Sequence, residues 1–125
     1  MDFLALVKAA FSGIYSVFAF ARQAPVLVVV TADRERYAAR VGGFLRSVQF
    51  SLIDIGIAVE HFVLAATEAG VGTCWIGWFN ERGVRKALDV PRSVRVVALL
   101  CVGYPSEGLR EPTPRKNLEE IRSYV

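Results

Sequence analysis

The stretch LIDIGIAVEHFVLAATEAGVGTCWIGWFN, residues 52–80, decides the fold of this chain. Its first part, residues 52–70, predicts one long helix that ends at Gly70, because glycine readily takes the left-handed conformation of a helix C-terminus. The side chains that interrupt its apolar surface are Asp54, Glu60, His61, Thr67 and Glu68. These are too few for a helix with a solvent face of normal width. We therefore expect a central helix that is buried by its own sheet, by a partner subunit, or by both.

The second part, AGVGTCWIGWFN at residues 69–80, has glycines and aromatic residues where a surface loop usually has serine, asparagine or lysine. The glycines at 70, 72 and 77 let the backbone approach a bound group closely and leave N–H groups free to donate. Three aromatic side chains add flat apolar surface: Trp75, Trp78 and Phe79. The residues allow two interpretations, a loop that holds a flat ligand or a helix-to-helix turn whose tryptophans fill the core.

Two apolar runs predict strands. The run VLVVVT at residues 26–31 is rich in β-branched residues and follows Ala24-Pro25, which indicates a strand buried on both faces. The run SVRVVALLCVGYP at residues 93–105 predicts a second buried strand, closed by Gly103 and Pro105.

The segment before the first strand predicts a helix from Asp2, its N-cap, to about Ala21. Asp2 and Lys8 make this segment unlike a secretion leader, which needs a basic start and an unbroken apolar run. Lys8 also interrupts the uncharged run that a membrane span requires. We therefore expect no membrane association.

Three further segments complete the chain. Residues 80–91, NERGVRKALDVP, predict a short amphipathic helix that begins near Asn80, is stopped by Pro91 and turns Val84, Ala87 and Leu88 inward. Residues 33–40 predict a charged turn or short helix. A proline-rich polar loop, residues 106–117, leads into the carboxyl-terminal LEEIRSYV.

Length and composition narrow the class of protein. With 125 residues, 54% of them hydrophobic, and no linker, the chain is expected to form a single domain over residues 1–125. The net charge of +3 comes without a basic stripe interleaved with aromatic residues, so no nucleic-acid partner is expected. Cys74 and Cys101 are far apart in sequence and His61 is the single histidine, so no metal site is expected. Two reduced cysteines suit a cytoplasmic protein.

The side chains predict no catalytic constellation. A lone histidine on an apolar helix, such as His61, is usually packed or hydrogen-bonded. Asp54 and Glu60 are six residues apart, which places them on different faces of a helix, so they cannot work as a carboxylate pair. Cys74 has no neighbouring base in the sequence and is interpreted as structural.

Six signals nevertheless follow one another in a distinctive order. They are Asp54-Ile-Gly56-Ile-Ala58, Leu64-Ala65-Ala66, Gly70-Val-Gly72-Thr-Cys74-Trp75-Ile-Gly77, Leu88-Asp-Val-Pro91, Ala98-Leu-Leu-Cys-Val-Gly103-Tyr104-Pro105, and Arg115-Lys116 before Leu118-Glu119-Glu120. In this order and spacing the chain resembles the nitroreductase family of FMN-dependent oxidoreductases over nearly its whole length.

The resemblance implies an α+β fold with a small, mostly antiparallel sheet flanked by helices. It also implies a homodimer formed through the helix at residues 52–70, with LEEIRSYV extending across the partner. NAD(P)H would give hydride to N5 of FMN, and the reduced flavin would pass electrons to a small-molecule acceptor such as a nitroaromatic or a quinone. Because the cofactor carries this chemistry, no catalytic side chain is predicted.

The resemblance also implies cofactor-binding residues. These are Cys74, Trp75, Ile76, Gly77 and Trp78 at the flavin, with the backbone N–H groups around Gly77 and Trp78 near N5, and Arg115 and Lys116 at the phosphate. Many relatives have Glu-Gly where this chain has Gly77-Trp78, which leaves the backbone role intact and changes the side chains. From the residues alone, a basic pair on an exposed tail such as Arg115-Lys116 is usually solvated.

Two motifs of the family have no counterpart here, its Arg-Arg-Ser-type phosphate motif and its Asn-x-Gln-Pro-Trp-type flavin segment. We therefore expect the match to be amino-terminally truncated relative to the family. We also expect FMN to bind weakly or not at all. Two alternatives to an FMN-dependent oxidoreductase stay open. One is a non-catalytic dimeric fragment or binding protein of the same fold, and the other is one half of a two-chain enzyme.

Overall fold

The computed structural model describes residues 2–33, 50–107 and 113–124. The turn or short helix expected at residues 33–40 lies beyond Asp33 outside the described residues.

Three strands form one antiparallel sheet: β1 (Val26–Asp33), β2 (Gly72–Ile76) and β3 (Val94–Gly103). Their order is β1-β3-β2, so the last strand in the sequence lies in the middle and pairs with both others. The expected small antiparallel sheet flanked by helices, and with it the α+β class, is confirmed.

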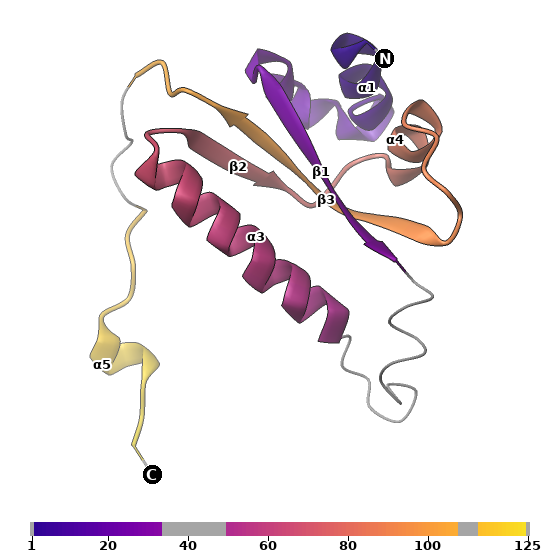
Figure 1. Ribbon diagram of the computed structural model, residues 1–125. Coiled ribbons are helices and arrows are strands. Elements are labelled where there is room, and N and C mark those ends of the chain that lie inside the picture. The colour runs from indigo at the N-terminus through magenta and orange to yellow at the C-terminus, as the bar shows by residue number, and fades with distance from the viewer. Residues whose placement is uncertain (1, 34–49, 108–112, 125) are drawn as a thin grey trace.

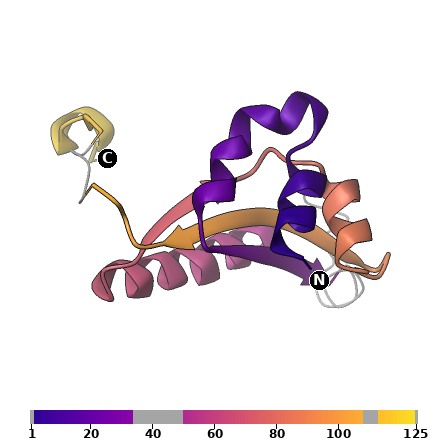
Figure 2. The same cartoon turned by 90° about the horizontal axis from the view of Figure 1, so that it is seen from above.

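Helices cover the two faces of the sheet unequally (Figures 1 and 2). One face carries α1 (Phe3–Ala10) and the 3-10 helix η1 (Gly13–Gln23), with α4 (Glu81–Ala87) packed beside α1. The long helix α3 (Phe50–Glu68) runs along the other face. The short helix α5 (Leu118–Ile121) belongs to a tail that extends away from the sheet.

The single amino-terminal helix predicted from Asp2 to about Ala21 is wrong in length. Asp2 does cap α1, since its carboxylate accepts a hydrogen bond from the Leu4 N–H at 3.1 Å. The helix then ends at Ala10, and Gly13 takes a positive φ of 62° where the chain turns into η1. Glycine reaches this left-handed region without the steric cost of other residues, which explains the break.

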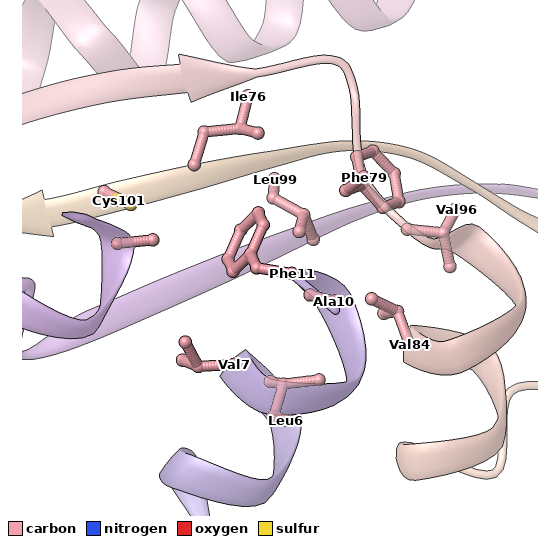
Figure 3. Packing of buried hydrophobic residues seen from close by; sticks show 11 residues of the cluster. Leu6, Val7, Ala10, Phe11, Ile76, Phe79, Val84, Val96, Leu99 and Cys101 are labelled. Atoms are coloured by element: carbon pink, nitrogen blue, oxygen red, sulfur yellow. The ribbon is translucent and has the colours of Figure 1, made fainter. Parts of the chain in front are cut away.

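The main core lies between α1, α4 and the sheet (Figure 3). Its most buried side chains include Val7, Phe11, Ile76, Val84 and Leu99. The amphipathic helix predicted at residues 80–91 is confirmed at its start, where the Asn80 side chain accepts a hydrogen bond from the Gly83 N–H at 2.9 Å.

The inward side of α4 also matches the prediction, because Val84 is fully buried and Ala87 and Leu88 pack against the core. The helix ends at Ala87, earlier than predicted from Pro91, and Asp89 takes a positive φ of 53° in the turn that follows.

The two predicted strands differ in burial. The strand predicted at residues 93–105 is confirmed as the buried central strand β3. The strand predicted at residues 26–31 is confirmed as β1, but its burial on both faces is wrong, since no residue of β1 is fully buried. The reason is its place in the sheet, because β1 is bonded to a single neighbour within the described residues.

Helix α3 confirms the long helix predicted at residues 52–70 and its end at Gly70. Gly70 has a φ of 73°, and its N–H donates to the Thr67 carbonyl while the Val71 N–H donates to the Ala66 carbonyl. This pair of bonds is the Schellman motif that closes many helices.

The sheet alone does not bury α3, because Val59 is its one buried residue. By length and composition α3 could also cross a membrane, with a mean hydropathy of 1.6 in its most apolar window, although core helices of soluble proteins meet the same test.

Candidate functional site

The predicted glycine-rich loop contains a strand. Residues 72–76 form β2, and Cys74, Trp75 and Ile76 lie in it. The interpretation of residues 69–80 as a helix-to-helix turn is therefore wrong. The predicted ligand-holding loop is shorter than expected, because the strand occupies part of it. The strand was not predicted, because glycine and aromatic residues are mixed in it. It pairs with β3 from Gly72 opposite Gly103 to Ile76 opposite Leu99.

The side chains of β2 alternate between the two faces of the sheet. Ile76 is only 1% exposed and belongs to the core, so it can offer a ligand nothing but backbone. Trp75 points to the other face and is 42% exposed. Cys74 is exposed.

Gly77 and Trp78 follow directly after β2 and are both exposed. A Cβ added at Gly77 would meet no atom within 4 Å, so the backbone there faces open space. Among the loop and turn hydrogen bonds of the described residues, none uses the N–H of Gly77 or Trp78. The segment therefore has free backbone donors beside an open space.

An aromatic cluster borders this open backbone. The Trp78 ring meets Tyr15 edge-on at a centroid distance of 5.6 Å and Phe18 at 6.1 Å. Sequence reasoning missed Tyr15 and Phe18, because the break at Gly13 that turns η1 toward Trp78 was not predicted. It also misplaced Phe79, which is buried in the core instead of adding aromatic surface to a ligand site.

These residues fit the ring of a flavin in two respects. A flat ring needs apolar surface to lie against, and Trp78 is 53% exposed beside the open backbone, whereas Trp75 is exposed on the other face of the sheet. Its polar edge needs donors, and the open backbone at Gly77 and Trp78 can supply them.

The phosphate half of the predicted site lies elsewhere. Arg115 and Lys116 are exposed and precede α5, in the tail that runs away from the sheet in both views (Figures 1 and 2). Within one chain the structure does not bring them to Gly77 and Trp78.

His61 and Cys101 are two further side chains considered in the sequence. His61 is exposed on α3 within one chain. In the part of the chain that the structure describes, no group of three His, Cys, Asp or Glu residues could hold a metal ion. Burial, and secondarily the neighbouring Cys74, raise the pKa of Cys101 to about 11.

An open depression of about 1030 Å³ lies beside α4, and none of the predicted cofactor-binding residues lines it. Four basic side chains line it, Arg82, Arg85, Lys86 and Arg92, together with Glu81 and Asp89. The Arg85 guanidinium donates to the Pro91 carbonyl at 2.9 Å, which fixes it along the rim. Sequence reasoning did not single out these basic residues.

Comparisons with known proteins show the family and the fold. The family model described as the nitroreductase family matches residues 16–104. A 5,6-dimethylbenzimidazole synthase of Rhodospirillum rubrum is 30% identical over 100 residues, which cover 80% of this chain and 46% of that protein. The chain spans less than half the length of the curated relatives it matches.

Solved structures share the fold. A nitroreductase family protein of Clostridium novyi NT is 38% identical with a TM-score of 0.69, covering 86% of this chain and 59% of that one. An FMN-dependent nitroreductase of Clostridium difficile R20291 has a TM-score of 0.62 over 94% of this chain and 62% of its own, and at 23% identity it shows the fold alone.

Proposed function

This chain belongs to the nitroreductase family, and on that basis we propose that it is an FMN-dependent oxidoreductase that takes electrons from NAD(P)H. The observation that carries the proposal is the exposed backbone of Gly77 and Trp78 at the end of β2, bordered by aromatic side chains. The sequence resemblance to the nitroreductase family of FMN-dependent oxidoreductases supports FMN as the cofactor. Residues 1–125 would form one domain.

The residues of the chain would divide the binding of FMN. The N–H groups of Gly77 and Trp78 would donate to the flavin edge at N5, and the Trp78 side chain would shield the ring. Cys74, Trp75 and Ile76 would contribute the strand that holds this segment in place. Arg115 and Lys116 would hold the phosphate, where the planar guanidinium can bind two oxygens at once. When bound, the flavin supplies the hydride chemistry, and the chain orients it and excludes water.

We further propose a homodimer that covers the apolar face of α3. Ile53, Ile57 and Leu64 form an exposed stripe at helical spacing, and contiguous apolar patches of this kind mark contact surfaces. A second copy is a better occupant than lipid, because Asp54 and Glu60 would carry charge into the hydrocarbon layer. The tail also suits a dimer, since its exposed Leu118, Ile121 and Tyr124 contact no core in their own chain.

The test of the cofactor site is a titration of the purified chain with FMN, followed by flavin fluorescence. Replacing Gly77 with valine fills the open space at the strand end, so we expect FMN affinity to fall about tenfold or more, while thermal stability stays unchanged. Gly56→Ala is the matched control, because the space around Gly56 on α3 is equally open and lies outside the proposed site. Equal FMN affinity of Gly77→Val and the unsubstituted chain would refute the assignment.

The same titration separates the alternatives. A non-catalytic dimeric fragment or binding protein would leave FMN unbound at all concentrations. One half of a two-chain enzyme would bind FMN only after a second chain is added. If FMN binds, bleaching of the flavin absorbance by NADH or NADPH identifies the donor, and a panel of nitroaromatics and quinones identifies the acceptor. The relative named 5,6-dimethylbenzimidazole synthase shows that family membership does not specify the acceptor.

A further inference from the structure

Cys74 and Cys101 lie directly opposite each other on the neighbouring antiparallel strands β2 and β3. Opposite residues of an antiparallel pair point to the same face of the sheet. That face is the one covered by α1, because the next pair on the same face, Ile76 opposite Leu99, lies in the core with Cys101 (Figure 3). The two thiols are therefore neighbours on the face that α3 does not cover.

The spacing of such a pair suits a disulfide. Opposite Cα atoms in an antiparallel ladder are about 4.5 or 5.5 Å apart, depending on the pair type, and both values lie within the range of roughly 4.4–6.8 Å found across disulfides. Opposite Cβ atoms are about 4.5–5.5 Å apart, so closing the bond needs a movement of up to about 1 Å.

Strand β2 is able to make the movement that closes the disulfide. Within the described sheet β2 is hydrogen-bonded on one side only, to β3. Gly72 begins the strand and Gly77 follows it, so flexible backbone lies at both ends.

The two thiols differ in access to solvent. Cys74 is exposed, and its Sγ lies 3.7 Å from the Trp75 carbonyl oxygen, a weak contact that leaves the sulfur accessible. Cys101 is 7% exposed and rests against the core. An oxidant from solvent would thus meet Cys74 first, with Cys101 next to it and protected.

We propose that Cys74 and Cys101 form a reversible cross-strand disulfide when the protein meets a hydroperoxide. The exposed Cys74 thiolate attacks the peroxide oxygen, is oxidised by two electrons to a sulfenic acid, and releases water once the leaving oxygen is protonated. The Cys101 sulfur then attacks the Cys74 sulfur, the S–S bond forms, and the sulfenic oxygen leaves as a second water with the Cys101 proton. In total, two thiols and one hydrogen peroxide give one disulfide and two waters.

The raised pKa of Cys101 agrees with the order of these steps, because the resting Cys101 stays protonated and Cys74 is the thiol that reacts. Oxidation of Cys74 to a neutral sulfenic acid also removes the repulsion by its thiolate, the second cause of that raised pKa. The proposal does not depend on flavin binding.

The test treats the native chain with hydrogen peroxide at neutral pH, counts free thiols and measures the intact mass. We expect both thiols to disappear together, a mass loss of two hydrogens, and a tryptic peptide pair joined through Cys74 and Cys101 that dithiothreitol separates. Two variants serve as matched controls. Cys101→Ser should stop at a Cys74 sulfenic acid, trapped by dimedone, and Cys74→Ser should keep its single thiol.

Three results would overturn the proposal. They are a Cys74 that proceeds to sulfinic acid in the unsubstituted chain while Cys101 stays free, a disulfide between two chains on a non-reducing gel, and thiols that both survive peroxide at a dose that oxidises Cys101→Ser. Circular dichroism of each variant before treatment checks that the fold is intact, so that unfolding cannot produce a false link.

Discussion

Gly83 and Gly103 are the residues at which the fold leaves least room. A Cβ at Gly83 would overlap the Ala9 carbonyl oxygen where α4 meets α1, and a Cβ at Gly103 would lie 2.6 Å from Cδ of Pro25. Gly83 keeps the backbones of α4 and α1 in direct contact, and Gly103 lets the Pro25 ring pack against β3. They are therefore packing sites, unlike Gly77, whose surroundings are open.

We predict that Gly83→Ala lowers the free energy of unfolding by roughly 1–3 kcal/mol, because α1 and α4 must separate to admit the methyl group. Urea denaturation followed by tryptophan fluorescence measures this change. In Gly56→Ala the new methyl group meets open space and alanine favours the helix, so the same measurement should show no loss. Equal stability of the two variants would contradict the close packing of α1 on α4.

Cys101 makes the free energy of unfolding depend on pH in the alkaline range. Burial raises the pKa of Cys101 from 9.0 in an unfolded chain to about 11, so between these values the unfolded thiol is ionised and the folded thiol is not. The unfolded state then binds fewer protons, and the free energy of unfolding falls as pH rises from 9 toward 11, by roughly 2–3 kcal/mol from this group.

In Cys101→Val this contribution disappears, so denaturation midpoints measured from pH 8 to 11 should fall less steeply than in the unsubstituted chain. Parallel pH profiles would show that the thiol ionises equally in both states.

Among residues, local signals were predictable and distant contacts were not. Asp2, Asn80 and Gly70 act at helix ends through hydrogen bonds or backbone conformations set within a few residues, and all three were identified from the sequence. Tyr15 and Phe18 gain their place beside Trp78 only when η1 folds back on the sheet, a contact that no local pattern encodes.

At the scale of elements, long or strongly patterned segments were predicted and short ones were not. Helix α3 and strand β3 have enough apolar residues to be identified in isolation. Strand β2 has five residues, one of them glycine, and becomes a strand because β3 pairs with it. The prediction that β1 is buried on both faces was wrong for a related reason, since the place of β1 at the sheet edge is decided by the other strands.

The exposed face of α3 gives a prediction at this scale. If α3 packs against a second copy, Ile57→Glu should convert a dimer into a monomer, because Ile57 is 54% exposed in one chain and a buried charge would be unpaired in the interface. Sedimentation velocity measures the mass. The control is Ile14→Glu on η1, an exposed apolar side chain on the opposite face of the sheet. Binding to lipid vesicles with no change of mass would favour a membrane as the occupant.

At the scale of the whole molecule, the candidate site is divided between the strand end at Gly77 and the tail at Arg115. The sequence predicted both halves through family resemblance, but it could not predict their separation, which depends on the path of the tail. If the tail of one subunit completes the site of the other, the two halves of each site come from different chains.

Mixing two defective chains tests this arrangement. Gly77→Val and Arg115→Ala should each bind FMN poorly alone, while a heterodimer of the two contains one site with both halves intact. We expect high-affinity FMN binding to return in part after the variants are unfolded and refolded together. If the mixture binds FMN no better than the separate variants, Arg115 serves its own chain or does not bind phosphate.

The position of β3 in the sheet has a consequence for synthesis. Strand β1 pairs with β3 from Val26 opposite Val102 to Asp33 opposite Val94, so its partner leaves the ribosome only after residues 34–93 have been made. Until then neither β1 nor β2 can form its pairing in the described sheet, because both pair with β3. Long-range pairing of this kind slows folding and exposes β-prone segments to aggregation. The nascent chain should therefore depend on chaperones until its last strand emerges.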